Sequence, residues 1–122
     1  MTISYRFEVN GNILFVTTSG FDGDLEEVFA YNDAVVKAGL ENDCKRILCD
    51  ERNLEYRLGL VDTYALAEYA AKKAPFLVRV AIIHRPEDAQ EAEFYETVAT
   101  NRGLAVRIFN DFDAALTWIK ED

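Results

Sequence analysis

The sequence predicts an α/β fold in which a mixed sheet of about five strands is combined with about four helices. Three observations predict it. Short apolar runs rich in β-branched residues alternate with longer segments of helical periodicity. An Asn-Gly pair near the N-terminus is typical of a hairpin turn. The later strands alternate with helices, which requires parallel neighbours, so only the first strand is expected to run antiparallel to its neighbour.

The first segment, Ile3 to Thr18, predicts a β-hairpin. Apolar and polar residues alternate along its first half, where the apolar positions are Tyr5, Phe7 and Val9. Asn10-Gly11 supplies the positive φ angles that a type I′ turn needs. Ile13 to Val16 is apolar on both faces, as in a strand covered on both sides, and Ser19-Gly20 is expected to end it.

The first helix is expected to begin at Asp24, which forms a capping-box-like pair with Glu27. Apolar residues then recur at helical spacing, and Gly39 is placed to adopt the left-handed conformation near the end of this helix. The second helix is expected to run from about Val61 to Lys73 and to stop at Pro75.

Between these helices, Ile47-Leu48-Cys49 predicts a short buried strand that stops at Asp50 and is followed by a loop over Glu55 to Leu60. The remaining elements follow from the same signals. They are a strand over Leu77 to Ile83, a helix over Glu87 to Arg102 that stops at Gly103, a strand over Leu104 to Phe109, and a short helix capped by Asp111 or Asp113.

Composition limits the class of function. The 122 residues suit one domain, residues 1–122, with its own core. A net charge of −9 disfavours binding to nucleic acid and to anionic membrane surfaces. The apolar runs are too short for stable membrane insertion, so any membrane contact is expected to be peripheral and apolar. No secretory signal opens the sequence, and Cys44 and Cys49 lack metal or redox spacing, which predicts reduced thiols and a cytoplasmic location.

Four segments carry a resemblance to a known family. They are DLEEVFAYNDAV (residues 24–35), RILCDERNL (46–54), VRVAIIH (78–84) and LAVRIFNDFDAALTWI (104–119). Together with the order of the elements, they resemble the SpoIIAA-like fold of STAS domains, in particular the small stand-alone bacterial branch described as SpoIIAA-like or STAS/SEC14. The resemblance covers nearly the whole chain. It implies a mixed sheet built as a β-α superhelix.

The resemblance implies a non-enzymatic module that regulates by protein contact or binds a small apolar or lipid-like ligand. Anti-sigma-factor antagonists of this family carry a phosphorylatable serine, in an Asp-Ser pair, where the loop after the third strand meets the next helix. Here that position falls near Leu58-Gly59, and neither residue can be phosphorylated. The nearest candidate is Thr63, which follows Asp62. A partner switch phosphorylated near Thr63 is therefore the second hypothesis.

Polar residues follow the expected ends of two strands. In open α/β sheets, ligands bind outside the carboxyl ends of the strands. The sequence therefore predicts a ligand site that includes Asp50, Arg52, His84 and Arg85.

The loop after the third strand adds an apolar element to this site. If the loop over Glu55 to Leu60 lifts, Tyr56 and Leu58 gate an apolar cleft between the second and third helices. Such a cleft would take a small apolar ligand.

The third hypothesis is a small enzyme in which His84, beside Asp50, acts as a general base. No Ser or Cys nucleophile accompanies this histidine, and a structural role at a strand end is the competing interpretation. The partners of a receiver-domain aspartate are missing, and no glycine-rich phosphate loop or metal-ligand spacing occurs. The sequence therefore predicts no cofactor and no metal.

Assembly is the last expectation. Helices that lie mainly on one face of a sheet leave an apolar surface on the other, and a second copy of the chain can cover it. The sequence predicts a homodimer for this reason.

Overall fold

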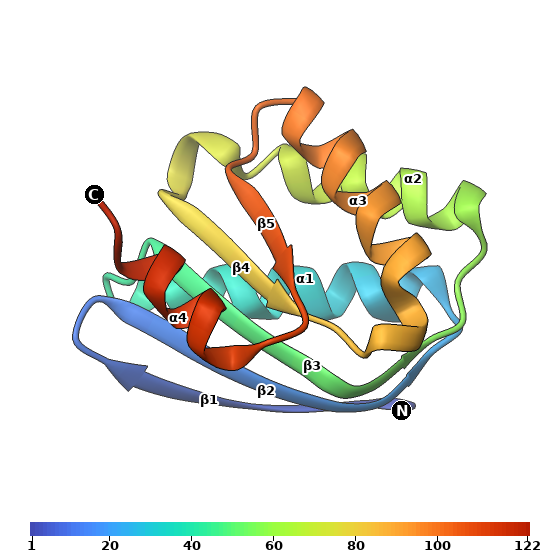
Figure 1. The fold of residues 1–122 in the computed structure, drawn as a ribbon, viewed down its shortest axis with the longest axis horizontal. Coiled ribbons are helices and arrows are strands. Elements are labelled where there is room, and N and C mark those ends of the chain that lie inside the picture. Colours follow the sequence, from blue (N-terminus) through green and yellow to red (C-terminus); the bar gives the residue numbers. More distant parts are fainter.

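The computed structural model describes residues 1–122 and contains one five-stranded sheet in the order β1-β2-β3-β4-β5 (Figure 1). β1 runs antiparallel to β2, and all other neighbours are parallel. The strands are β1 (Ile3–Asn10), β2 (Ile13–Asp22), β3 (Arg46–Tyr56), β4 (Arg79–Ile83) and β5 (Val106–Phe109). The helices are α1 (Leu25–Glu41), α2 (Leu60–Ala71), α3 (Ala89–Asn101) and α4 (Phe112–Lys120), with 3₁₀ turns η1 (Ala74–Phe76) and η2 (Pro86–Asp88). The predicted fold class is confirmed.

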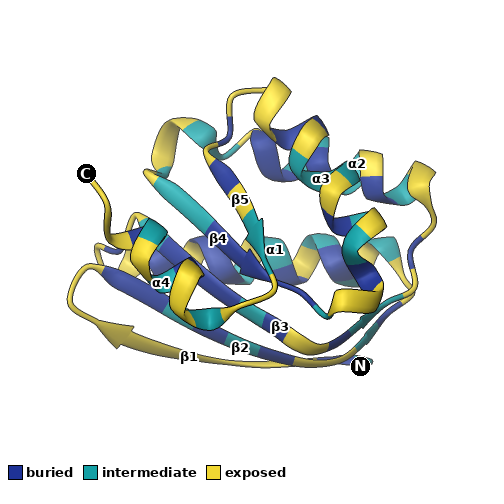
Figure 2. Cartoon of the chain, in the orientation of Figure 1, coloured by how far each residue is buried: buried dark blue, intermediate teal, exposed yellow.

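The helices divide unequally between the two faces of the sheet. α1, α2 and α3 lie on one face, where the larger core forms, and α4 alone covers the other (Figures 1 and 2). The innermost strands carry the most buried side chains, whereas β1 is exposed along almost its whole length (Figure 2). Among the largest fully buried side chains are Leu14, Ile47, Leu48, Ile83 and Ile119.

The first hairpin forms where the sequence predicted it, but its turn is shifted by one residue. Asn10 pairs with Ile13, so the two turn residues are Gly11 and Asn12 rather than Asn10 and Gly11. Gly11 has a φ of 63°, and Asn12 has no positive φ. A positive φ at the first turn position alone is the type II′ pattern, not the predicted type I′.

Strands β2 and β3 are longer than predicted, which corrects two expected strand ends. β2 continues past Ser19-Gly20 to Asp22, and β3 continues past Asp50 to Tyr56. The two extensions pair with each other in parallel. Because this pairing satisfies their backbone groups, the polar stretch after Asp50 remains in the sheet and does not form a loop.

The N-terminal residues are held against β2 and α1. Gly20 has a φ of 102°, and a Cβ added there would lie 2.0 Å from the carbonyl oxygen of Thr2, so only glycine fits. The Glu27 carboxylate accepts hydrogen bonds from the backbone N–H groups of Thr2 and Ile3 at 2.8 and 3.1 Å. The capping-box prediction required Glu27 to bind the N-cap residue of its own helix. Glu27 binds the start of the chain instead.

Three predicted helix ends are confirmed by their geometry. Asp24 caps α1 by accepting a hydrogen bond from the Glu26 N–H at 3.3 Å. Asp111 caps α4 by accepting one from the Ala114 N–H at 3.0 Å. Gly103, directly after α3, has a φ of 97°.

The prediction that Gly39 adopts the left-handed conformation near the end of α1 is wrong. Asp43, with a φ of 56°, takes this conformation instead of Gly39. Gly39 lies within α1, where an added Cβ would approach the Cys44 carbonyl oxygen to 2.8 Å. Glycine is needed there because the loop after the helix passes close to it. The other predicted ends differ from the structure by a residue or two.

Candidate functional site

A cavity of about 100 Å³ lies between the sheet and helices α1, α2 and α3. Nineteen of its 24 lining residues are hydrophobic, so its surface suits an apolar molecule. The cavity arises because α2 packs mainly against α1 and α3, and because its buried side chains are short. These side chains are Thr63, Ala67, Ala70 and Ala71.

Glu51 places a carboxyl group on the wall of this cavity. It lies on β3 at a shift in the strand register, where Glu51 and Arg52 stand opposite the single residue Thr18. The extra residue changes which positions of β3 face the cavity. Before the bulge these are odd-numbered and after it even-numbered: Ile47, Cys49 and Glu51, then Leu54 and Tyr56. A bulge that re-aims side chains in this way is common beside binding sites.

Two tyrosines hold the Glu51 carboxyl group. The Tyr31 hydroxyl donates to one carboxyl oxygen at 2.8 Å, and the Tyr56 hydroxyl donates to the other. Because the single proton of Tyr31 points to Glu51, Thr18 must donate to Tyr31 across their 2.8 Å contact. Glu51 is only 7% exposed and forms no ion pair. The carboxyl group is thus hydrogen-bonded but has no compensating positive charge.

This environment changes the acidity of the whole group. Burial raises the pKa of Glu51 to about 7, against the opposing hydrogen bonds of Tyr56 and Tyr31 and with smaller raising effects of Asp22 and Asp50. Burial beside Glu51 also raises the pKa of both tyrosine hydroxyls well above the usual value. Near neutral pH the glutamate therefore exists in both protonation states, while the tyrosines remain hydrogen-bond donors.

Tyr56 and Leu58, two of the predicted ligand-binding residues, both line the cavity. The loop that was expected to lift is shorter than predicted, because β3 includes Tyr56 and α2 begins at Leu60. Asp22 anchors what remains of it. One carboxylate oxygen of Asp22 accepts hydrogen bonds from the N–H groups of Arg57 and Leu58 at 2.6 and 3.2 Å.

Asp50 and Arg52 lie away from the cavity. Their side chains form an ion pair at 2.7 Å, which lowers the pKa of Asp50, and the Arg52 guanidinium lies over the ring of Phe112 in α4. They therefore belong to the α4 face of the sheet. The structure does not bring them together with Tyr56 and Leu58.

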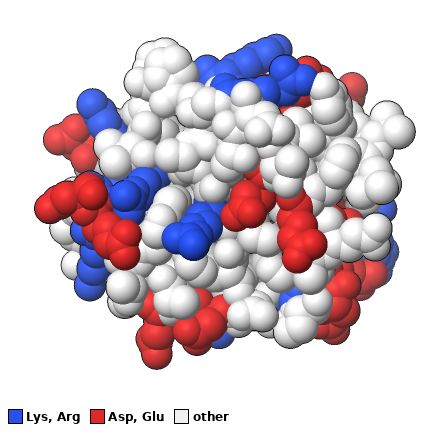
Figure 3. Space-filling view, turned by 45° about the horizontal axis from the view of Figure 1, so that its top comes forward, with Lys and Arg blue, Asp and Glu red and all other residues white.

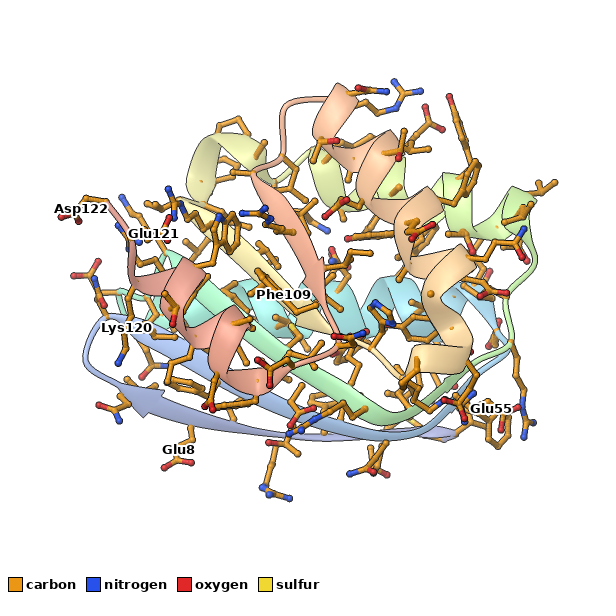
Figure 4. The ribbon with its side chains drawn as sticks, viewed as in Figure 1. Glu8, Glu55, Phe109, Lys120, Glu121 and Asp122 are labelled. Carbon is orange, nitrogen blue, oxygen red and sulfur yellow. The ribbon has the colours of Figure 1, made fainter.

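His84 and Arg85 also lie outside the cavity. His84 is buried, and its Nδ1 contacts the carbonyl oxygen of Arg85 at 2.7 Å. It lines a separate shallow recess beside Phe109 of β5 (Figure 4). Arg85 forms an ion pair with Asp88 at 2.9 Å. No hydrogen bond joins His84 to Asp50, so the pair required by the enzyme hypothesis is not assembled.

Thr63 lies in the first turn of α2 and lines the cavity. It is 6% exposed, and its hydroxyl donates to the Gly59 carbonyl oxygen at 2.9 Å. A kinase would have to unwind this turn to reach the hydroxyl. Phosphorylation of Thr63 stays a prediction, and this geometry does not favour it.

Sequence reasoning missed the central residue of the site. The predicted strand stops at Asp50, one residue before Glu51, although the alternation of Ile47 and Cys49 continues to Glu51 with a period of two. A carboxyl group at a core-facing strand position is a signal in itself, because burying a charge without a partner is costly. Tyr31 and Asp22 come from distant segments, and only the folded chain brings them to β3.

The surface above this site has a mixed charge pattern. Figure 3 brings forward the side on which α2 and α3 lie, and both basic and acidic side chains are scattered over it, with areas without charges between them. None of the helices is both long enough and apolar enough to cross a membrane.

Comparisons with known proteins agree with the architecture. No family model matches the sequence, and no curated protein matches it. Among solved structures, an anti-sigma factor antagonist from Mycobacterium paratuberculosis superposes with a TM-score of 0.64 at 17% identity, over 98% of this chain and 95% of that one. An uncharacterized DUF3478-family protein with a SpoIIAA-like fold from Shewanella loihica PV-4 gives 0.61 at 20% identity, over 96% and 93%. The chain therefore has the SpoIIAA-like fold that its sequence predicted.

Proposed function

We propose that this chain is a single-domain, non-enzymatic regulatory module of the STAS or SpoIIAA-like type that binds a small, largely apolar molecule in the cavity beside Glu51. The observation that carries the proposal is a buried carboxyl group on the wall of a mainly apolar cavity. A glutamate without a positive partner is costly for the fold, so a binding role accounts for its place in the core.

Binding is favoured over catalysis by what surrounds Glu51. Its raised pKa alone would suit a general base. However, burial raises the pKa of the Cys49 thiol, the nearest nucleophile, and leaves it unreactive. No lysine, arginine or histidine lines the cavity to stabilise a developing negative charge. These groups can hold a ligand but do not form a catalytic set.

The start of α2 supports a read-out by protein contact. Leu60, Val61 and Tyr64 expose apolar side chains there, with Val61 84% exposed. This surface directly follows the loop that Asp22 anchors over the cavity. Occupancy of the cavity would therefore be transmitted to the apolar surface through the loop, and a protein partner would sense it.

Native and denaturing mass spectrometry of the protein purified from its own host test the proposal. Extra mass in the native spectrum that disappears on denaturation is expected. The variant Ala70→Leu, which fills the cavity from α2, should abolish the extra mass. A bare chain mass in both spectra, together with no change in melting temperature on addition of small apolar molecules, would contradict ligand binding.

The partner switch phosphorylated at Thr63 remains the second candidate function. It rests on the similarity in fold to an anti-sigma factor antagonist. Mass that persists on denaturation and maps to Thr63 would support it, and an unmodified peptide under all growth conditions would remove it. A cytoplasmic location also remains part of the proposal and agrees with the two free, buried cysteines.

A further inference from the structure

The volume of the cavity limits the size of its ligand. A dry apolar cavity of about 150 Å³ accommodates a molecule as large as benzene. The cavity described above is smaller, at about 100 Å³. A ligand that enters without rearranging the fold therefore has no more than about six non-hydrogen atoms. This size limit excludes a fatty acid or detergent chain, which would be the usual lipid-like ligand.

The charges around the cavity limit the charge of the ligand. The elements packed around Glu51 present mainly carboxyl groups and hydroxyls: Asp22 from β2, Tyr31 from α1, Thr63 from α2, Glu91 and Tyr95 from α3, and Asp88 from η2. The Asn32 amide of α1 also lines the cavity, and its oxygen accepts from Lys73, which is paired with Asp33. Arg85 is held by Asp88 in an ion pair, and Arg52 by Asp50. Arg57 is paired with Glu55 and lies over the ring of Phe21. The polar end of the cavity is therefore negative when Glu51 is ionised.

The hydrogen bonds at Glu51 also favour a ligand head group that donates hydrogen bonds. Thr18 donates to Tyr31, and Tyr31 and Tyr56 each donate to Glu51. The hydroxyl protons of these hydrogen bonds therefore all point toward the carboxylate. A carboxylate has about four acceptor positions, so about two remain for a ligand. Tyr95 lines the cavity without a hydrogen-bond partner and can donate or accept, so it does not decide between ligands. The remaining capacity at Glu51 is capacity to accept.

From these three limits, and resting on the proposed function, we infer that the cavity binds a small primary aliphatic amine as its ammonium ion, with the alkyl group among the apolar side chains and the ammonium paired with the Glu51 carboxylate. The ammonium supplies the positive charge that Glu51 lacks and donates to its free acceptor positions. A small carboxylate of the same shape is rejected, because it would bring a second negative charge next to Glu51.

Calorimetric titration of the full chain at 150 mM salt with three four-carbon molecules tests the inference. The probes are isobutylamine, isobutanol and isobutyrate, which share one branched four-carbon skeleton and differ in the group at its end. At pH 8 the amine is expected to bind at least about tenfold more tightly than isobutyrate, since a charged hydrogen bond contributes that much or more. Lowering the pH to 5.5 protonates Glu51 and should weaken the amine about tenfold, with the alcohol almost unchanged.

Variants separate the site from the acidic surface. Glu51→Gln should abolish the preference for the amine while isobutanol still binds. Glu8→Gln is the matched control, because Glu8 extends from β1 into solvent (Figure 4). Ala70→Leu should eliminate binding of all probes. If Glu51→Gln fails to fold, the pH dependence of the unmodified chain carries the test.

The outcomes distinguish a failure of the amine inference from a failure of the proposed function. Equal binding of the three probes, or tightest binding of isobutyrate, overturns the inference and leaves a ligand-binding cavity. Amine binding that persists in Ala70→Leu or is lost in Glu8→Gln places the amine on the surface, which also overturns the inference. Absence of binding by every probe, including the neutral alcohol, contradicts the proposed function itself.

Discussion

Glu51 makes the stability of the fold depend on pH in the direction opposite to that of most carboxyl groups. Its pKa is about 7 in the folded chain and 4.5 ordinarily. Between these two pH values Glu51 is ionised in the unfolded chain but protonated in the folded chain, so rising pH favours unfolding. The contribution is fully present below pH 4.5 and is lost as the pH rises through 7, with a magnitude of about 3 kcal/mol.

The variant Glu51→Gln should flatten this part of the stability profile. Urea unfolding at pH 5, 6, 7 and 8 gives the free energy of unfolding, and the loss between pH 5 and 8 should shrink markedly in the variant. Glu8→Gln should keep the original slope. An unchanged slope in Glu51→Gln would show that Glu51 is ionised in the fold at all these pH values.

Asp22 anchors the loop between β3 and α2. Asp22→Ala removes the acceptor of the Leu58 N–H and one of the two acceptors of the Arg57 N–H, which keeps the Asp22 backbone carbonyl oxygen at 3.0 Å. The change should lower the free energy of unfolding by about 1–3 kcal/mol. Asp22→Asn keeps an acceptor oxygen and should recover most of it. Hydrogen exchange gives a local check, because the Leu58 amide, whose only acceptor is the Asp22 side chain, should exchange faster in Asp22→Ala only. Equal exchange in all three proteins would exclude the anchoring role.

At the scale of elements, helix α2 explains why the cavity exists. Ala70 lines the cavity, whereas Ala67 is fully buried in the core and does not. Ala70→Leu should therefore change the free energy of unfolding by less than about 1 kcal/mol, because the added atoms enter free space. Ala67→Leu should cost about 1–3 kcal/mol by overpacking. Similar costs for the two variants, measured by urea unfolding, would mean that the cavity cannot accept the added atoms.

Strand β3 shows how far the sequence could predict the structure. Periodicity was sufficient for the order of the elements, because each helix and strand has its own apolar face. It failed after Asp50, where the residues are polar and would form a loop if they were alone. They remain a strand because the extension of β2 pairs with them, and Arg52 and Asp50 pair on the α4 face. Such pairing is not local, so sequence spacing does not reveal it.

The candidate site was predictable only in part for the same reason. Tyr56 and Leu58 were identified as residues of a loop that would gate an apolar cleft, and both line the cavity. Asp50, Arg52, His84 and Arg85 were grouped by their expected strand ends, but their side chains bond elsewhere: Asp50 pairs with Arg52, and Arg85 with Asp88. The bulge that turns Glu51 into the core depends on the register between two strands, which no local pattern encodes.

At the scale of the whole molecule, the exposed edge strand gives the predicted homodimer a specific face. β1 has one unpaired edge, and its apolar residues Tyr5, Phe7 and Val9 are 37%, 39% and 45% exposed. Tyr5 lies beside α1, where the centroids of the Tyr5 and Tyr31 rings are 5.3 Å apart. Soluble proteins usually protect such an edge with charged residues or with another strand. We therefore expect two copies of the chain to associate through β1 and its apolar row.

Equilibrium sedimentation checks this assembly. The unmodified chain should sediment as a dimer, and Phe7→Lys should sediment as a monomer, because a lysine at this position puts an unpaired charge into the apolar row that the interface would bury. Glu8→Lys introduces the same residue at the neighbouring position, which points to the opposite face of the sheet, and should leave the dimer intact. A dimer that survives Phe7→Lys would move the interface to the α4 side of the sheet. A clean monomer for the unmodified chain would contradict dimerisation altogether, and β1 would then be protected only by its own charged residues, Arg6 and Glu8.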